Sequence, residues 1–123
     1  MYLVGAPHRC KTDAQILLGT CITERQRLVT DAEVLQEILQ RSAAIDRREA
    51  IQPAFDALLG VVDHVHPIDV VTIQRAKAIV LERKSLSARE AVHVAVMEQH
   101  GIDQIMTFDA GFDEVPGILR LKA

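Results

Sequence analysis

The sequence predicts an α/β domain with a mainly parallel sheet and helices on both faces. Short apolar runs that suit buried strands alternate with longer segments in which apolar residues recur at helical spacing, and several of these segments begin at capping residues. Strands that are separated by helices favour parallel pairing in one sheet. A length of 123 residues, with 49% hydrophobic and 25% charged residues, suits one soluble domain with a single core.

The first elements are a helix and a short strand. Thr12 and Gln15 form a capping-box pair, and the helix is predicted over 12–24. An apolar run at 27–30, bounded by charge, predicts a brief buried strand that leads directly into the next helix.

Helical patterns fill the following part of the chain. Thr30 with Glu33 is expected to cap a helix. Its predicted apolar face consists of Val34, Leu35, Ile38 and Leu39. Asp46 with Glu49 offers another cap, and the pattern continues to Val62 in two pieces, because Pro53 imposes a kink or a restart.

The second half repeats the strand-to-helix order. Residues 65–68 predict a strand that ends at Asp69, whose side chain can cap a helix. That helix should bury Ile73, Ala76 and Val80.

A third capping box and two further strands complete the pattern. Ser87 with Glu90 begins a helix that stops at Gly101. Residues 104–108 predict the next strand, and 118–121 predict a last strand at the edge of the sheet.

Composition excludes several functional classes. The 14 Lys and Arg residues face 17 Asp and Glu residues, and a net charge of −3 provides no overall basic field to attract nucleic acid. An aromatic content of 3% argues against a base-stacking platform. Cys10 and Cys21 form no CxxC pair, and we find neither a secretory signal nor an apolar run of about 20 residues, so we expect a cytoplasmic protein without a membrane anchor.

Three carboxylates are candidates for one site. Ligands of parallel α/β sheets bind outside the carboxyl ends of the strands. Glu37 lies two turns into the helix after the 27–30 strand, Glu90 lies in the first turn of its helix, and Asp109 follows the 104–108 strand. If the three meet, they supply the oxygen ligands that suit Mg²⁺ or Mn²⁺.

Each candidate also has an ordinary structural interpretation. Glu37 could be a solvated helix residue, Glu90 is fully explained by its capping box, and Asp109 could stabilise a turn. His64 and His66 are interpreted as edge-strand histidines rather than metal ligands, because a third nearby ligand is not evident. We interpret His93 as a packed helix residue.

The order and spacing of three segments resemble the PIN domain family, and within it the VapC-like toxins of bacterial toxin-antitoxin pairs. The segments are Leu28-Val29-Thr30 through Leu39, Leu86-Ser87-Ala88-Arg89-Glu90-Ala91-Val92-His93-Val94-Ala95, and Ile105-Met106-Thr107-Phe108-Asp109 through Phe112. With the intervening region, the resemblance runs from near Met1 to Leu121. It implies a three-layer α/β/α sandwich and a metal-dependent endoribonuclease.

The resemblance also implies roles and partners. Glu90 would hold Mg²⁺ (or Mn²⁺) directly, Asp109 would assist directly or through water, and Glu37 would position the water that attacks the RNA phosphodiester in line. An RNA substrate, a cognate antitoxin that blocks the acidic groove, and a homodimer are implied as partners. A noncatalytic PIN relative that binds RNA or an antitoxin, and an unrelated α/β domain, remain as alternatives.

This chain departs from the family pattern at two places. Glu90 stands where the family usually has an aspartate, which keeps the charge but adds a methylene. The family begins with a central strand that ends in an aspartate, and the opening of this chain resembles the stretch after that aspartate. We therefore treat 1–123 as a single, N-terminally incomplete PIN-like domain; the alternative is that Tyr2–Val4 is a strand and Gly5 replaces the acid.

Overall fold

The computed structural model describes residues 2–5, 27–106, 115 and 119–121, which include a five-stranded parallel sheet. The strand order is β3-β2-β1-β4-β5, and every pairing is parallel. The strands are β1 (Tyr2–Val4), β2 (Leu28–Asp31), β3 (His64–His66), β4 (Gln104–Met106) and β5 (Leu119–Leu121). The helices are α2 (Ala32–Ala44), the short 3-10 helix η1 (Arg48–Ala50), α3 (Ile51–Leu59), α4 (Val70–Glu82) and α5 (Ala88–His100). The helix predicted over 12–24 lies outside the described residues.

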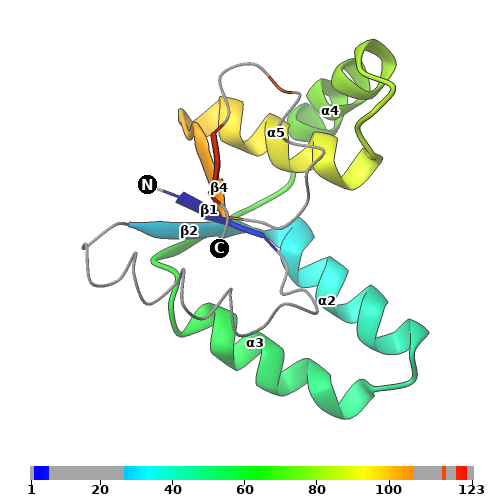
Figure 1. Ribbon diagram of the computed structural model, residues 1–123, viewed down its shortest axis with the longest axis vertical. Helices are drawn as coiled ribbons and strands as arrows, with labels where there is room; N and C mark the ends of the chain where they lie inside the picture. The colour runs from blue at the N-terminus through cyan, green and yellow to red at the C-terminus, as the bar shows by residue number, and fades with distance from the viewer. Residues whose placement is uncertain (1, 6–26, 107–114, 116–118, 122–123) are drawn as a thin grey trace.

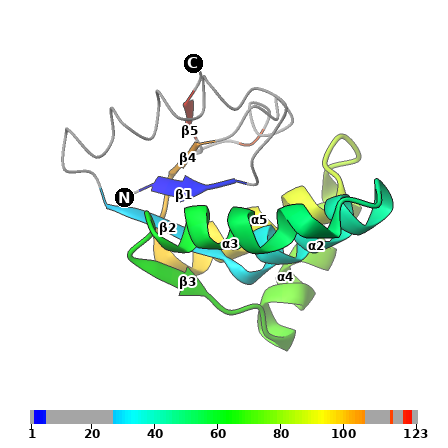
Figure 2. The same cartoon turned by 90° about the horizontal axis from the view of Figure 1, so that it is seen from below.

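The helices form two layers around the sheet, which confirms the predicted three-layer α/β/α arrangement. Helices α4 and α5 lie on one face, and α2 and α3 lie on the other (Figures 1 and 2). Successive strand residues point to opposite faces. Leu3 and Val29 accordingly pack in the cluster with α4 and α5, whereas Val4 and Leu28 pack in the cluster with α2 and α3.

The centre of the sheet differs from the favoured prediction. We expected the central strand to lie upstream of Met1 and to leave its neighbours unpaired, but β1 occupies this place and pairs with both β2 and β4. The side chain of Leu3 is fully buried there. The alternative assignment of Tyr2–Val4 as a strand therefore describes this sheet, and an upstream segment with an acid stays a prediction.

Two predicted helix starts are confirmed, one moves by a residue and one is wrong. The predicted cap of Asp46 with Glu49 does not form, because η1 begins after Arg47 and has no side-chain cap. Asp69 caps α4 by accepting a hydrogen bond from the Thr72 amide, and Ser87 with Glu90 forms a full capping box on α5. The cap of α2 is Asp31 rather than Thr30, because β2 extends one residue further than predicted. Gly101 ends α5 with a φ of 65°, a left-handed conformation that glycine adopts without a steric penalty.

Other differences are local. Leu39 of α2 and Ile73 of α4 are about half exposed, although both were predicted to face the core. Pro53 lies in the first turn of α3, where a proline is tolerated, so the predicted restart occurs at Ile51. Strand β5 lies at the edge of the sheet as predicted. Among the described helices, none combines the length and apolar character required to cross a bilayer.

Candidate functional site

The carboxyl end of β2 carries a fully buried acid, Asp31. Its Oδ1 accepts a hydrogen bond of 3.0 Å from the Val34 amide, which caps α2. The preceding residue, Thr30, donates from its hydroxyl to the Val4 carbonyl of the central strand at 2.8 Å. The end of β2 is therefore fixed both to β1 and to the first turn of α2.

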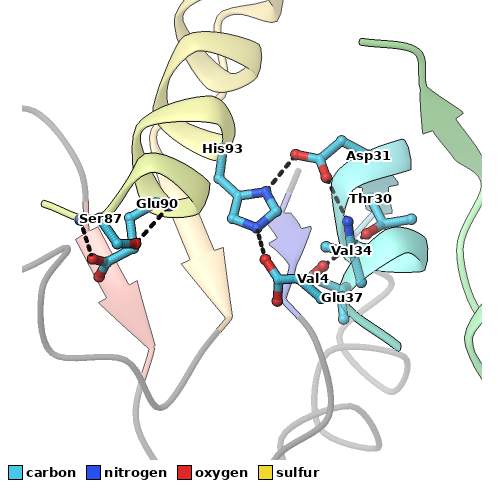
Figure 3. A network of polar contacts seen from close by, with 8 residues as sticks. All are labelled: Val4, Thr30, Asp31, Val34, Glu37, Ser87, Glu90 and His93. Carbon is cyan, nitrogen blue, oxygen red and sulfur yellow. Dashed lines mark hydrogen bonds and ion pairs between the residues drawn. The ribbon is translucent and has the colours of Figure 1, made fainter. Parts of the chain in front are cut away.

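His93 of α5 connects this acid to a second carboxylate. Its Nδ1 lies 2.6 Å from Asp31 Oδ2, and its Nε2 lies 2.8 Å from Glu37 Oε1 (Figure 3). Asp31, Glu37 and His93 come from the end of a strand and from helices on opposite faces of the sheet. We call these three residues the Asp31–His93–Glu37 bridge.

The bridge carries a charged imidazole. His93 is 4% exposed, and burial by itself lowers the pKa of a histidine. The hydrogen bonds and charges of Asp31 and Glu37 outweigh this effect and raise the pKa of His93 to about 10. At neutral pH both ring nitrogens therefore carry protons, and each donates to a carboxylate.

A further acid, Glu33, lies one turn before Glu37 on α2. Burial raises the pKa of Glu33, and the charge of His93 opposes this rise. Asp31 and Glu37 raise the pKa of Glu33 further, whereas the positive charge of Arg89 lowers it.

Glu90 occupies a different environment, one turn before His93 on α5. Its side chain is buried, and Oε1 accepts a hydrogen bond of 2.8 Å from the Ser87 amide, while the Glu90 amide donates to Ser87 Oγ at 3.2 Å. Figure 3 shows Glu90 directed toward Ser87, whereas His93 is directed toward Asp31 and Glu37. The capping interpretation of Glu90 is therefore confirmed, and its role toward a metal stays a prediction.

The structure brings the predicted site residues together only in part. Glu37 belongs to the bridge, Glu90 lies on the same helix as His93, and Asp109 lies outside the described residues. Sequence reasoning did not select Asp31, although its position at the carboxyl end of a parallel strand is the signal used for Asp109. His93 was predicted to be packed, which is confirmed, but its contacts with two carboxylates were missed.

The other described histidines are not members of this bridge, although His66 lies beside Asp31 in the register of β2 and β3. His64 and His66 are on the edge strand β3, as predicted, and the His66 ring stacks on His100 with a centroid distance of 3.7 Å. Burial lowers the pKa of His66, and the nearby His100 and His64 lower it further. Within the described part of the chain, no three His, Cys, Asp or Glu side chains are placed to hold a metal ion.

The chemistry of the acidic side chains nevertheless fits a hard divalent cation. Glu37 and Glu90 are both largely buried and offer carboxylate oxygens, the ligand type that Mg²⁺ and Mn²⁺ prefer. Two carboxylates do not complete an octahedral site, so further oxygens have to come from water, from a substrate phosphate or from residues such as Asp109.

Comparison with known proteins places this arrangement in context. The model of the PIN domain family matches residues 7–118. "VapC ribonuclease Mb1869c" from Mycobacterium bovis and "Ribonuclease VapC13" from Mycobacterium tuberculosis are each 58% identical to this chain over 121 residues, which cover 98% of this chain and 92% of theirs.

Two solved structures share the fold. Mycobacterium tuberculosis VapC20, described as a sarcin-ricin loop cleaving toxin, superposes with a TM-score of 0.79 at 20% identity and covers 100% of both chains. A toxin-antitoxin complex from Klebsiella pneumoniae gives a TM-score of 0.61 at 16% identity, covering 97% of this chain and 96% of that chain.

Proposed function

Because this chain belongs to the PIN domain family and resembles its VapC ribonucleases over nearly its whole length, we propose that it is the endoribonuclease toxin of a toxin-antitoxin pair. The observation that carries this proposal is the 58% identity to two proteins named as VapC ribonucleases. The family match also excludes the alternative of an unrelated α/β domain.

The buried acids support hydrolysis of a phosphodiester. Glu37 is held by His93 at the carboxyl end of the sheet, where ligands of parallel α/β folds bind. A carboxylate held in this way can orient an attacking water molecule and accept its proton. The negative charges of Glu33 and Glu37 would repel RNA phosphates unless a cation is present, so these residues suit a cation-dependent reaction.

Members of this family generally use divalent metal ions, and we propose Mg²⁺ or Mn²⁺ for this chain. Glu90 and Asp109 would hold the ion, and Glu37 would lie beside it. When bound, such an ion supplies a Lewis acid that polarises the scissile phosphate and lowers the pKa of water. The extra methylene of Glu90, compared with the aspartate usual in the family, moves its carboxylate further from the backbone.

We propose RNA as the substrate, an antitoxin protein as the partner and a homodimer as the assembly. The structural neighbours include complexes of toxins with antitoxins, which supports the antitoxin partner. An antitoxin could block the site by placing a basic side chain against the acids near Glu37.

Cleavage of RNA by the purified chain tests this proposal. We expect cleavage with Mg²⁺ or Mn²⁺ and none with a chelator, and a loss of at least about 100-fold in Glu37→Gln and in Asp109→Asn. Glu82→Gln and Asp56→Asn make the same chemical changes at exposed helix positions and should cleave like the unmodified chain. Persistent metal-dependent cleavage in both site variants would contradict the site assignment.

The capping role of Glu90 favours a second candidate function. In this alternative, the PIN domain binds RNA or an antitoxin without cleaving RNA. The Glu90 side chain already satisfies the Ser87 amide, which leaves fewer lone pairs for a metal. Titration with Mg²⁺ distinguishes the two functions, because a ligand that binds the native state raises the unfolding temperature. A noncatalytic domain should show no such rise.

A further inference from the structure

The Asp31–His93–Glu37 bridge does more than join two helices. We propose that His93 is a positioning residue, which holds the Glu37 carboxylate in its working orientation, and that Asp31 fixes the ring of His93. This inference rests on the proposed ribonuclease function, because it assigns a role to residues beside the catalytic acid. It adds Asp31 and His93 to the functional residues of the chain.

The first step concerns the orientation of the ring. An imidazole has two nitrogens on opposite sides, and here a carboxylate oxygen lies within 2.8 Å of each. Turning the ring over would remove both nitrogens from their acceptors. Since His93 is 4% exposed, water could not replace the lost bonds, and a buried polar group left unpaired is unfavourable.

The second step concerns the anchor of the bridge. Asp31 is fully buried, and its two oxygens have separate partners: Oδ1 accepts from the Val34 amide and Oδ2 contacts His93. A rotation of this carboxylate away from His93 would also remove the cap of α2. The orientation of the imidazole is therefore set by backbone groups at the start of α2.

The third step concerns Glu37 itself. A glutamate side chain loses conformational entropy when it is fixed in one rotamer. The bond from His93 Nε2 to Glu37 Oε1 compensates for this loss and places the carboxylate at one position relative to α5, the helix that also carries Glu90. Partners of this kind, which orient a ligand or a catalytic group, typically affect metal affinity or activity 10–100-fold.

Mn²⁺ binding, measured by the electron paramagnetic resonance of the free ion, tests the proposal independently of turnover. We expect His93→Leu to weaken Mn²⁺ binding about 10–100-fold and Asp31→Asn to weaken it about 10-fold. His93→Gln keeps an N–H donor and should restore part of the affinity. Asp31→Asn keeps an oxygen that can cap α2, so its effect reports on the bridge rather than on helix formation.

A double-mutant cycle separates positioning from a purely structural role. If His93 acts through Glu37, then His93→Leu added to Glu37→Gln should change Mn²⁺ affinity by less than about twofold. Additive effects of the two substitutions would overturn the proposal. In steady-state kinetics we expect His93→Gln to lower kcat with little change in KM for RNA, because the bridge orients the acid and does not bind RNA.

The controls keep the failures distinguishable. His64→Leu makes the same chemical change at an exposed histidine of β3 and should bind Mn²⁺ like the unmodified chain. If the unmodified chain neither binds Mn²⁺ nor cleaves RNA, the proposed function fails and this inference fails with it. If the unmodified chain binds Mn²⁺ and cleaves RNA, and folded His93→Leu binds Mn²⁺ with the same affinity, only the role of the bridge is refuted. If His93→Leu does not fold, the Mn²⁺ affinities of Asp31→Asn and His93→Gln are compared with that of the unmodified chain instead.

Discussion

Substitution of Leu3 by alanine is a direct test of the central strand. Leu3 is fully buried between β2 and β4 and belongs to the core cluster that also contains Val29 and Ile105. Replacing a buried leucine by alanine costs about 2–5 kcal/mol, and a site enclosed on both sides by paired strands has little freedom to collapse. We therefore expect a loss of about 3 kcal/mol or more from the free energy of unfolding.

Urea unfolding followed by circular dichroism measures this loss. With a slope of about 1.5 kcal/mol per molar urea, the midpoint of Leu3→Ala should fall by about 2 M. Leu81→Ala is the matched control, because Leu81 is 75% exposed on α4 and its truncation should change stability by no more than about 0.5 kcal/mol. If Leu3→Ala is too unstable to study, Leu3→Val should show a loss of about 1 kcal/mol.

The result that would refute this reasoning is a midpoint for Leu3→Ala equal to that of Leu81→Ala. Equal midpoints would mean that Leu3 is not buried in the core, contrary to the pairing of β1 with both β2 and β4.

Three further predictions use the same unfolding assay. The pKa of His93 is higher in the folded state, at about 10, than in the unfolded state, so the stability that His93 contributes is complete below about pH 6.5 and is lost as the pH rises toward about 10. His93→Gln should therefore flatten the decline of the free energy of unfolding between about pH 7 and 10. Ser87→Ala removes the cap of α5 and should cost about 1 kcal/mol, whereas an unchanged midpoint would contradict the capping box. Gly101→Ala places a side chain at a φ of 65° and should cost about 1 kcal/mol, although no atom obstructs the new methyl group.

The order of the elements was predictable because local signals marked their boundaries. Ser87 and Glu90 form a capping box in sequence and in structure, and Gly101 ends the helix that they begin. Such signals depend on hydrogen bonds between residues three or four positions apart, which a single sequence contains in full. The predicted cap of α2 was wrong by one residue. Thr30 and Asp31 are both good capping residues, and only the extent of β2 decides between them.

The central position of β1 could not be predicted in the same way. Tyr2–Val4 is too short to show a period, and its burial depends on pairing with Leu28–Asp31 and Gln104–Met106, which are distant in the chain. The exposure of Leu39 has a similar origin, since the helical pattern defines a face but the packing of α3 decides how wide the buried face is.

The candidate site shows the same division between local and distant information. Glu37 was selected from its place after a predicted strand, and Glu90 from its place in a helix. The contact of His93 with Asp31 joins residues 62 positions apart, and its contact with Glu37 joins residues 56 positions apart. A histidine flanked by Val92, Ala95 and Val96 has the pattern of a core residue, and its polar role becomes visible only when the opposite helix is in place.

The bridge also explains why stability and activity should be linked in this chain. The oxygen of Asp31 that caps α2 and the oxygen that contacts His93 belong to the same carboxylate, so the group that starts the helix also orients the ring that holds Glu37. A change that loosens the end of β2 should therefore displace the proposed catalytic acid even when it lies far from RNA. It follows that substitutions at the β1–β2 contact, such as removal of the Thr30 hydroxyl that donates to the Val4 carbonyl, should reduce cleavage more than an equally destabilising change in α4.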